Sequence, residues 1–277
     1  MSRDLSGKWF VVTGANTGIG KVVARKLAER GASVTIACRS RQKGQAAIDE
    51  IKSTVPTATL DLVSLDLTDL DTVRTCAADL LARDTPLYGL VNNAGVASMR
   101  GQTTQGFELA FGVNHVGHFL LTQLLLPHLT ATPGSIIINV ASSSHYQAKG
   151  IDWDVVRKPS VTYTGLREYE VSKLANVMFT QKLAQKLAGT STTTYALCPG
   201  QVASDIWRRI PQPFRWLLER QMRTVDQGAA SVLSPMDEPD HNGKFYKKDG
   251  IARAPNRVAT PELANELWSR SEAWVGR

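Results

Sequence analysis

Short apolar runs rich in Val, Ile and Leu alternate with longer segments of helical periodicity along the whole sequence. This alternation is typical of a parallel β-sheet with helices on both faces, because the strands of such a sheet are buried on both sides. The pattern predicts about seven strands, near residues 9–13, 33–38, 59–65, 87–92, 135–142, 192–197 and 243–246. It predicts helices near residues 21–30, 41–53, 69–83, 104–129, 165–187, 225–233 and 261–272. We therefore expect a doubly wound α/β fold.

No internal repeat, low-complexity tract or long Pro/Gly/Ser linker divides the chain, so residues 1–277 are expected to form a single domain. Hydrophobic residues make up 43% of the sequence, which is enough for a sizeable core. Gly31 and Gly189 stand where two of the predicted helices should end. The net charge of +7 is spread along the chain, so we expect no nucleic-acid partner.

Cysteine and histidine usage argues against disulfide and metal chemistry. The three cysteines lie far apart and form no CxxC pair, as expected of a cytoplasmic protein: Cys38, Cys76 and Cys198. Three histidines lack metal-ligand spacing and are interpreted as structural or pocket-lining residues: His115, His118 and His145. We expect no secretion signal at the N-terminus and no transmembrane segment, because no run approaches about 20 apolar residues.

The stretch TGANTGIG, residues 13–20, follows the first predicted strand and precedes a predicted helix. Glycines at positions 14, 18 and 20 would let the backbone approach a pyrophosphate, and the N-terminus of the helix would offer it free amides. Their GxxxGxG spacing differs from the common GxGxxG pattern and from the P-loop. A dinucleotide cradle in a Rossmann-like fold and a simple glycine-rich turn both remain open at this point.

The end of the second predicted strand bears on which dinucleotide binds. A carboxylate usually stands there in NAD sites, whereas here Arg39 follows the strand. Arginine can pair with a 2′-phosphate, so the sequence predicts NADP(H), with Lys21, Arg41 and Lys43 adding positive charge nearby. The alternative is that Arg39 is an ordinary surface residue.

Tyr169 and Lys173 are four residues apart on a predicted helix, so both side chains project from one face. A phenol with a pKa near 10 is a poor acid or base at neutral pH, and a neighbouring ammonium group would lower that pKa. The pair therefore indicates acid–base catalysis, although an exposed pair on an amphipathic helix would look the same.

Seven motifs occur in the order found in the short-chain dehydrogenase/reductase superfamily, which the chain resembles over nearly its whole length: TGANTGIG (13–20), LDLTD (65–69), NNAG (92–95), GVNHVGHFLLT (112–122), NVASS (139–143), YEVSK (169–173) and PG (199–200). ACRS after the second strand, GVNHVGHF and EYEVSKLANVMFT are similar to the retinol dehydrogenase branch, whose relatives include protochlorophyllide reductases. Retinol dehydrogenases commonly begin with an apolar membrane segment that is not seen here, so a soluble carbonyl reductase is expected.

The resemblance implies a catalytic set of four residues: Asn114, Ser142, Tyr169 and Lys173. Ser143 is an alternative to Ser142, and the helix around Asn114 is expected to be distorted to hold a water of a proton relay. Thr13 is expected to brace the NNAG loop, in which Asn92 also resembles a cofactor contact. The expected cofactor-binding residues, which also include Tyr169 and Lys173, are Gly14, Asn16, Thr17, Gly18, Ile19, Gly20, Arg39, Asp66, Leu67, Asn93, Ala94, Gly95, Pro199, Gly200, Val202 and Ser204.

Two segments are expected to select the substrate, namely an insert near residues 143–168 and a lid near 204–223. Trp153, Val155, Val156 and Tyr163 of the insert either line a pocket or pack locally. In the lid, apolar residues that include Trp207 alternate with arginines, which suits a bulky lipophilic substrate or contact with a membrane surface. Besides Trp207, Ser142 and Tyr169 are expected to touch the substrate.

These observations predict an NADPH-dependent oxidoreductase that acts on a lipophilic aldehyde, ketone or alcohol, such as a retinal-like, steroid or polyketide-like compound. One alternative is a cofactor-binding sensor or scaffold without turnover. Another is a double-bond reductase of the protochlorophyllide reductase type. The resemblance also implies a homodimer or homotetramer built through the helices that carry Asn114 and Tyr169.

Overall fold

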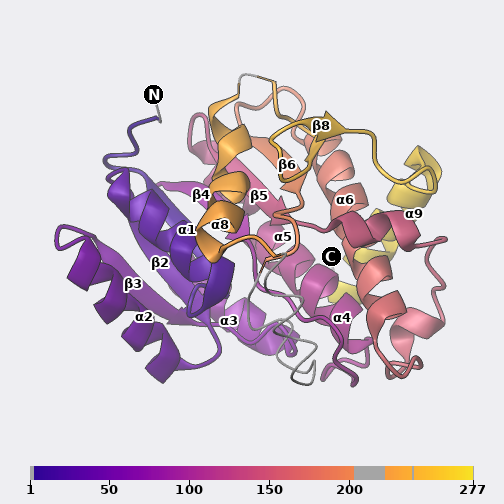
Figure 1. The fold of residues 1–277 in the computed structure, drawn as a ribbon. Coiled ribbons are helices and arrows are strands. Elements are labelled where there is room, and N and C mark those ends of the chain that lie inside the picture. Colours follow the sequence, from indigo (N-terminus) through magenta and orange to yellow (C-terminus); the bar gives the residue numbers. More distant parts are fainter. Residues whose placement is uncertain (1–2, 203–221, 239, 277) are drawn as a thin grey trace.

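The computed structural model describes residues 3–202, 222–238 and 240–276 (Figure 1). In this part of the chain eight strands form one sheet in the order β3-β2-β1-β4-β5-β6-β7-β8. The strands are parallel except for β8, which pairs antiparallel with β7. Their bounds are β1 Trp9–Thr13, β2 Ser33–Cys38, β3 Leu60–Ser64, β4 Leu87–Asn92, β5 Ile136–Val140, β6 Thr193–Leu197, β7 Phe245–Tyr246 and β8 Ala252–Arg253.

Helices cover both faces of the sheet (Figure 1). Their bounds are α1 Gly18–Glu29, α2 Arg41–Thr54, α3 Leu70–Leu81, α4 Leu109–Phe111, α5 Gly117–Ala131, α6 Leu166–Lys186, α8 Val225–Leu233 and α9 Pro261–Val275. A π-helical turn, Gly112–Val116, joins α4 to α5, and three short 3₁₀ turns span Ser143–Gln147, Val155–Arg157 and Ser234–Asp237. The predicted doubly wound, Rossmann-like α/β fold is confirmed.

The two larger apolar cores of the described residues lie on opposite faces of the sheet. One contains buried side chains of α1, α2 and α8, and the other contains side chains of α3, α5, α6 and α9. Residues of β1 such as Phe10 and Val11 point alternately to the two cores, as expected for a strand buried on both sides.

Local sequence signals fix the ends of several helices. The Ser40 hydroxyl accepts a hydrogen bond from the Lys43 amide at the start of α2, and Asp69 caps α3 in the same way through the Asp71 amide. Thr224 and Gln227 form a reciprocal capping box at α8. Gly31 has a φ of +85° just beyond α1, which is the left-handed conformation expected at a helix end.

The structure corrects two details of the sequence analysis. The eighth strand was not predicted, because β8 contains only two residues. The helix expected from residue 104 begins at Leu109, since Gly106 adopts a φ of +79° that interrupts a helix. By length and composition the helical stretch Leu109–Ala131 would suffice to cross a membrane, but 83% of its most apolar window is buried inside the fold.

Candidate active site

A cleft of about 720 Å³ runs along the carboxyl ends of the strands. It crosses the point between β1 and β4 where the strand order reverses, which is the usual ligand position in open α/β sheets. The structure brings eighteen of the predicted site residues to its wall: Gly14, Asn16, Thr17, Gly18, Ile19, Gly20, Arg39, Asp66, Leu67, Asn93, Ala94, Gly95, Ser142, Tyr169, Lys173, Pro199, Gly200 and Val202. Ser204 and Trp207 lie outside the described residues.

The glycine loop packs directly against the loop after β4. A Cβ atom on Gly14, whose φ is +65°, would lie 2.8 Å from the Cα of Ala94. A Cβ on Gly20 would lie 2.4 Å from Asn93 Nδ2 and 2.6 Å from the Gly14 carbonyl oxygen. Glycine is therefore required at both positions for the two loops to meet.

The N-terminus of α1 is open toward the cleft. Thr17 makes no side-chain capping bond there, and the first turn contains no acidic residue. Free amides and the positive end of the helix dipole are the features that bind phosphate groups. This geometry favours the phosphate cradle over the simple glycine turn.

Thr13, at the end of β1, braces the loop after β4 as expected. Its hydroxyl oxygen accepts hydrogen bonds from the amides of Asn93 and Ala94, both at 2.9 Å. The Asn93 side chain donates in return to the Thr13 carbonyl at 2.8 Å. The expectation that Asn92 contacts the cofactor is wrong, because its buried amide donates to Thr122 and Asn139 inside the core.

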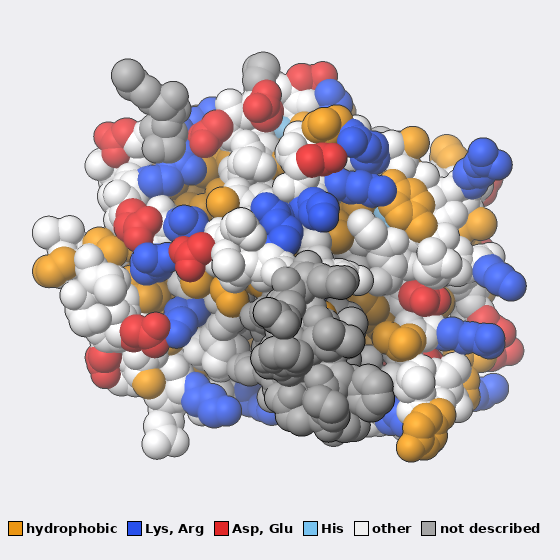
Figure 2. All heavy atoms as spheres, viewed as in Figure 1, with side chains coloured by type: hydrophobic (Ala, Val, Ile, Leu, Met, Phe, Trp, Pro, Cys, Tyr) orange, Lys and Arg blue, Asp and Glu red, His pale blue; other side chains and the backbone are white. Residues whose placement is uncertain are grey.

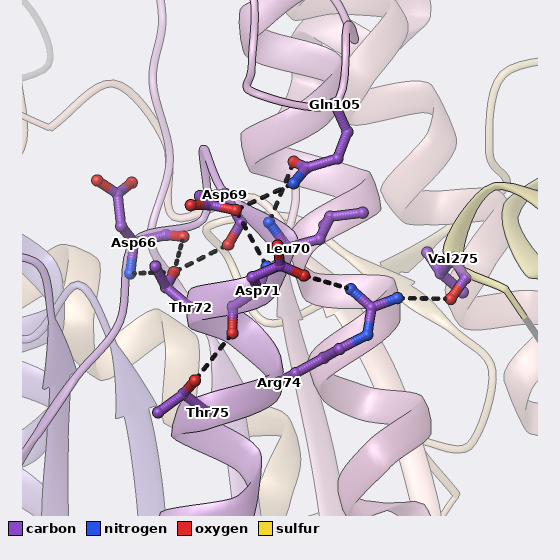
Figure 3. A network of polar contacts seen from close by, with 9 residues as sticks. All are labelled: Asp66, Asp69, Leu70, Asp71, Thr72, Arg74, Thr75, Gln105 and Val275. Atoms are coloured by element: carbon purple, nitrogen blue, oxygen red, sulfur yellow. Dashed lines mark hydrogen bonds and ion pairs between the residues drawn. The ribbon is translucent and has the colours of Figure 1, made fainter.

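Asp66 is held at the end of the cleft near β2 and β3 by a polar network at the start of α3 (Figure 3). The Thr72 hydroxyl donates to the backbone carbonyl of Asp66 at 2.6 Å, and Gln105 ties Asp69 to the first amide of the helix. One carboxylate oxygen of Asp66 accepts from Thr68, while the carboxylate points away from the network drawn. The other oxygen thus stays available to a ligand.

Arg39 lies at the same end of the cleft, with a side chain that is 74% exposed. Its guanidinium is 4.0 Å from the Asp66 carboxylate, a weak exposed pairing that leaves it available to an anion. Ser40 and Lys43 line the cleft beside it. The expectation that Lys21 adds positive charge at this end of the cleft is wrong, because its ammonium group pairs with Glu50 at 2.6 Å instead.

Tyr169, Lys173 and Ser142 meet at the opposite end. Tyr169 and Lys173 lie on successive turns of α6, and the Lys173 ammonium is 5.6 Å from the centre of the Tyr169 ring. Lys173 donates to the Val140 carbonyl at 2.9 Å, at the end of β5. Ser142 directly follows β5 and interacts with the Tyr169 phenol closely enough to lower its pKa, while the Ser142 hydroxyl donates to the Ser144 hydroxyl at 3.1 Å. Between the two serines left open by the sequence, this contact favours Ser142 over Ser143.

Asn114 sits in the π-helical turn, where the distortion expected from the resemblance is present. Its side chain does not line the cleft directly. The amide oxygen accepts from the Val96 amide at 2.9 Å, and the amide nitrogen donates to the Val96 carbonyl and to Ser172. Ser172, which sequence reasoning missed although it lies within YEVSK, donates in turn to the Tyr169 carbonyl at 2.7 Å. Asn114 therefore ties the loop after β4 to α6.

Burial controls the protonation of Tyr169 and Lys173. It raises the pKa of Tyr169 to about 12, although the interaction with Ser142 acts in the opposite direction. It lowers the pKa of Lys173 to about 8. The phenol pKa is therefore raised and not lowered as expected, because desolvation of the buried phenol is the largest effect on it. At neutral pH the phenol is protonated and can act as a proton donor.

The insert contributes little to the cleft among the described residues. Only Ser143 and Ser144 of the segment reach its wall. Val156 is buried in the core, Trp153 packs against Trp274 of α9, and Tyr163 is 90% exposed. For Trp153 and Val156 the structure decides in favour of local packing.

Three further basic residues on the cleft wall were not predicted as site residues. Figure 2 shows Lys and Arg side chains over the area where α8 and β8 lie in Figure 1. The cleft is also lined by Arg223, just before α8, and by Lys247 and Lys248, between β7 and β8. The Arg223 guanidinium is engaged by the carbonyls of Pro199 and Lys248. Lys247 and Lys248 directly follow β7. They could have been predicted as site residues, because ligands bind at the carboxyl ends of parallel strands.

The three histidines have separate partners. His115 lies 2.9 Å from the Ser271 hydroxyl of α9, and His145 lies 2.7 Å from the Ser142 carbonyl. His118 contacts Thr13 and the Asn114 carbonyl. Across the described ranges, no group of three or more His, Cys, Asp and Glu side chains is arranged to hold a metal ion.

Comparison with known proteins agrees with this geometry. The profile of the short chain dehydrogenase family matches residues 8–153. Retinol dehydrogenase 11 of Homo sapiens is 43% identical over 274 residues, which cover 97% of this chain and 86% of that protein. Retinol dehydrogenase 12 of Mus musculus is 37% identical over 284 residues, with 99% and 88% covered.

Solved structures show the same fold. An uncharacterized protein from Mycobacterium paratuberculosis is 30% identical with a TM-score of 0.80, covering 99% of this chain and 95% of that one. L-Sorbose reductase from Gluconobacter frateurii, at 19% identity, has a TM-score of 0.71 with 94% and 100% covered. The chain therefore belongs to the short-chain dehydrogenase/reductase family of oxidoreductases and, within it, resembles the retinol dehydrogenases.

Proposed function

We propose that this protein reduces the carbonyl group of a lipophilic aldehyde or ketone with NADPH. The observation that carries the proposal is the meeting of Tyr169, Ser142 and Lys173 at one end of a cleft whose other parts fit a dinucleotide. A phenol beside a buried ammonium group has no purpose in binding alone, so the arrangement favours turnover over a sensor or scaffold.

The residues present fit NADP(H). The glycine loop and the open N-terminus of α1 would hold the pyrophosphate, and Arg39 with Lys43 would pair with the 2′-phosphate. Asp66 would accept a hydrogen bond from the adenine, and Lys173 would hold the nicotinamide ribose. When bound, this cofactor supplies the hydride that is added to the carbonyl carbon.

The chain's own residues handle the proton. Ser142 donates a hydrogen bond to the substrate oxygen, which polarises the carbonyl and fixes its position. Tyr169 transfers its phenolic proton to the same oxygen, so the C=O double bond becomes an alcohol C–OH. The charge on Lys173 stabilises the phenolate that remains. The distorted turn at Asn114 would hold the water through which the proton is replaced.

Two observations support a lipophilic substrate. Val96, Ala97 and Met99 provide apolar lining beside the loop after β4. The relatives above are named for retinol, a lipophilic alcohol. The direct test is NADPH consumption with retinal, medium-chain aldehydes, steroid ketones and aromatic polyketide ketones. Tight NADPH binding without turnover of any compound would contradict the proposed reduction.

The 2′-phosphate contact predicts a selective effect of Arg39→Ala. Loss of a charge-assisted hydrogen bond should raise the Kd for NADPH by about 10- to 100-fold and leave the Kd for NADH unchanged. Fluorescence titration with both cofactors measures this. Arg41→Ala is the matched control, because Arg41 does not line the cleft. Equal losses for both cofactors would overturn the NADPH assignment.

The pKa of Lys173 predicts how reduction depends on pH. The ammonium form is present below a pKa of about 8 and lost above it. We therefore expect kcat/KM to be level below pH 8 and to fall about tenfold per pH unit above it. Tyr169, with a pKa of about 12, stays protonated throughout. In Lys173→Arg, which stays charged, the fall should move to higher pH. A wild-type profile that stays level well above pH 8 would contradict this role.

A further inference from the structure

His118 is a buried polar residue that the proposed mechanism does not use. It lies in α5, one turn after Asn114, and only 3% of its surface is exposed. Its Nε2 atom is 2.9 Å from the Thr13 hydroxyl oxygen, and its Nδ1 atom is 3.2 Å from the Asn114 carbonyl oxygen. Neither His118 nor Thr13 lines the cleft. The histidine thus stands between two residues that shape the site.

Counting hydrogens fixes the form of the imidazole ring. The Asn114 carbonyl can only accept, so the Nδ1 atom of His118 must carry a hydrogen. In the neutral ring Nε2 is then an acceptor. The Thr13 oxygen already accepts from two amides, which use both of its lone pairs. Its own proton must therefore be donated, and Nε2 at 2.9 Å is nearer than the Val91 carbonyl at 3.3 Å.

A neutral ring is what this environment favours. Burial lowers the pKa of His118 to about 4, the hydrogen bond to Asn114 acts in the opposite direction, and the positive charge of Lys173 lowers it further. A doubly protonated ring would direct a third N–H at the Thr13 oxygen, which has no lone pair left. The neutral Nδ1–H tautomer alone satisfies every partner.

We propose that His118 is a positioning residue that couples the cofactor loop to the turn carrying Asn114. By accepting the Thr13 proton, it turns the two lone pairs of that hydroxyl toward the amides of Asn93 and Ala94. By donating to the Asn114 carbonyl, it holds the π-helical turn. The inference rests on the proposed function only through the use of NADPH as its probe.

The test is a double-mutant cycle on the Kd for NADPH with His118→Phe, Thr13→Val and the double variant. His118→Phe removes the hydrogen bond to Thr13 and should raise the Kd about tenfold. Thr13→Val removes the same bond together with the acceptor of the Asn93 and Ala94 amides, so it should raise the Kd at least as much. Because His118 acts through Thr13, adding His118→Phe to Thr13→Val should cause much less than a further tenfold loss, about tenfold being the loss expected of independent changes. Additive losses, or a His118→Phe variant that binds NADPH like the wild type, would overturn the proposal.

His115→Phe is the matched control. His115 is equally buried in the neighbouring turn, but it contacts Ser271 of α9 and packs among phenylalanine rings. Its replacement should leave the Kd for NADPH unchanged whatever it does to the melting temperature. A loss equal to that of His118→Phe would show a general packing effect and contradict the proposal.

A second measurement needs no variant and no cofactor. NMR of nitrogen-labelled histidine in the wild-type protein should show His118 as the neutral Nδ1–H tautomer at neutral pH. An Nε2–H tautomer or a charged ring would overturn the proposal even if a variant failed to fold. If the wild type bound no NADPH, the proposed function would be refuted. The NMR measurement of the His118 tautomer would still test the hydrogen bonds on which the positioning role depends.

Discussion

Replacing Tyr169 with phenylalanine is expected to lower kcat for carbonyl reduction by about 10²- to 10⁴-fold. The change removes only the hydroxyl group that donates the proton, and it keeps the ring packed in α6. NADPH binding should persist, because the glycine loop and the N-terminus of α1 are untouched. Single-turnover measurement of NADPH oxidation, with a separate titration of cofactor binding, distinguishes the two effects.

Tyr163→Phe is the control for this experiment. Tyr163 lies in the insert, 90% exposed and away from the cleft, so removal of its hydroxyl should leave kcat unchanged. A Tyr169→Phe variant that reduces the substrate at the wild-type rate would refute the assignment of the proton donor. In that case Ser142 or a solvent molecule would be the proton donor.

Gly14→Ala is expected to damage both folding and cofactor binding. The left-handed φ of +65° costs about 1–2 kcal/mol for a residue with a Cβ atom. Contact of that atom with Ala94, at 2.8 Å, adds about 1–3 kcal/mol of overpacking. The free energy of unfolding should therefore fall by about 2–5 kcal/mol. The Kd for NADPH should rise more than about tenfold, because the loops that line the cleft are forced apart.

Gly7→Ala separates the two contributions. Gly7 has a similar φ of +72°, but nothing lies within 4 Å of a Cβ built there. In Gly7→Ala the free energy of unfolding should fall only by the backbone cost of about 1–2 kcal/mol, and NADPH should bind as in the wild type. Urea denaturation and cofactor titration of both variants measure the difference. Equal losses would mean that the approach of Gly14 to Ala94 does not matter.

The central part of the fold could be predicted from the sequence because its signals are local. The strands at residues 9–13, 33–38 and 87–92 are short, mostly apolar runs, and their bounds match β1, β2 and β4. The π-helical turn at Asn114 was expected only through the resemblance. Periodicity could not have indicated it, since the apolar pattern of residues 109–131 continues through the turn.

Other features depend on contacts between distant parts of the chain. The position of Lys21 after the glycine loop suggests contact with a phosphate, but in the structure its ammonium group pairs with Glu50 of α2. The phenol pKa of Tyr169 depends on how completely the site is buried, which spacing along a helix does not reveal. The partners of His118 come from β1 and the neighbouring turn, so the histidine carried no functional signal in the sequence.

The short eighth strand has a consequence for self-association. A long, flat edge strand offers unpaired backbone groups to another molecule, but here one edge of the sheet is the two-residue β8, where Arg253 pairs with Asp249. The opposite edge, β3, is five residues long and carries Asp61, which pairs with Arg83. Backbone pairing with another molecule is therefore hindered at β8 by its short length and at both described edges by charged side chains. Fibril-like extension of the sheet is thus disfavoured at both described edges.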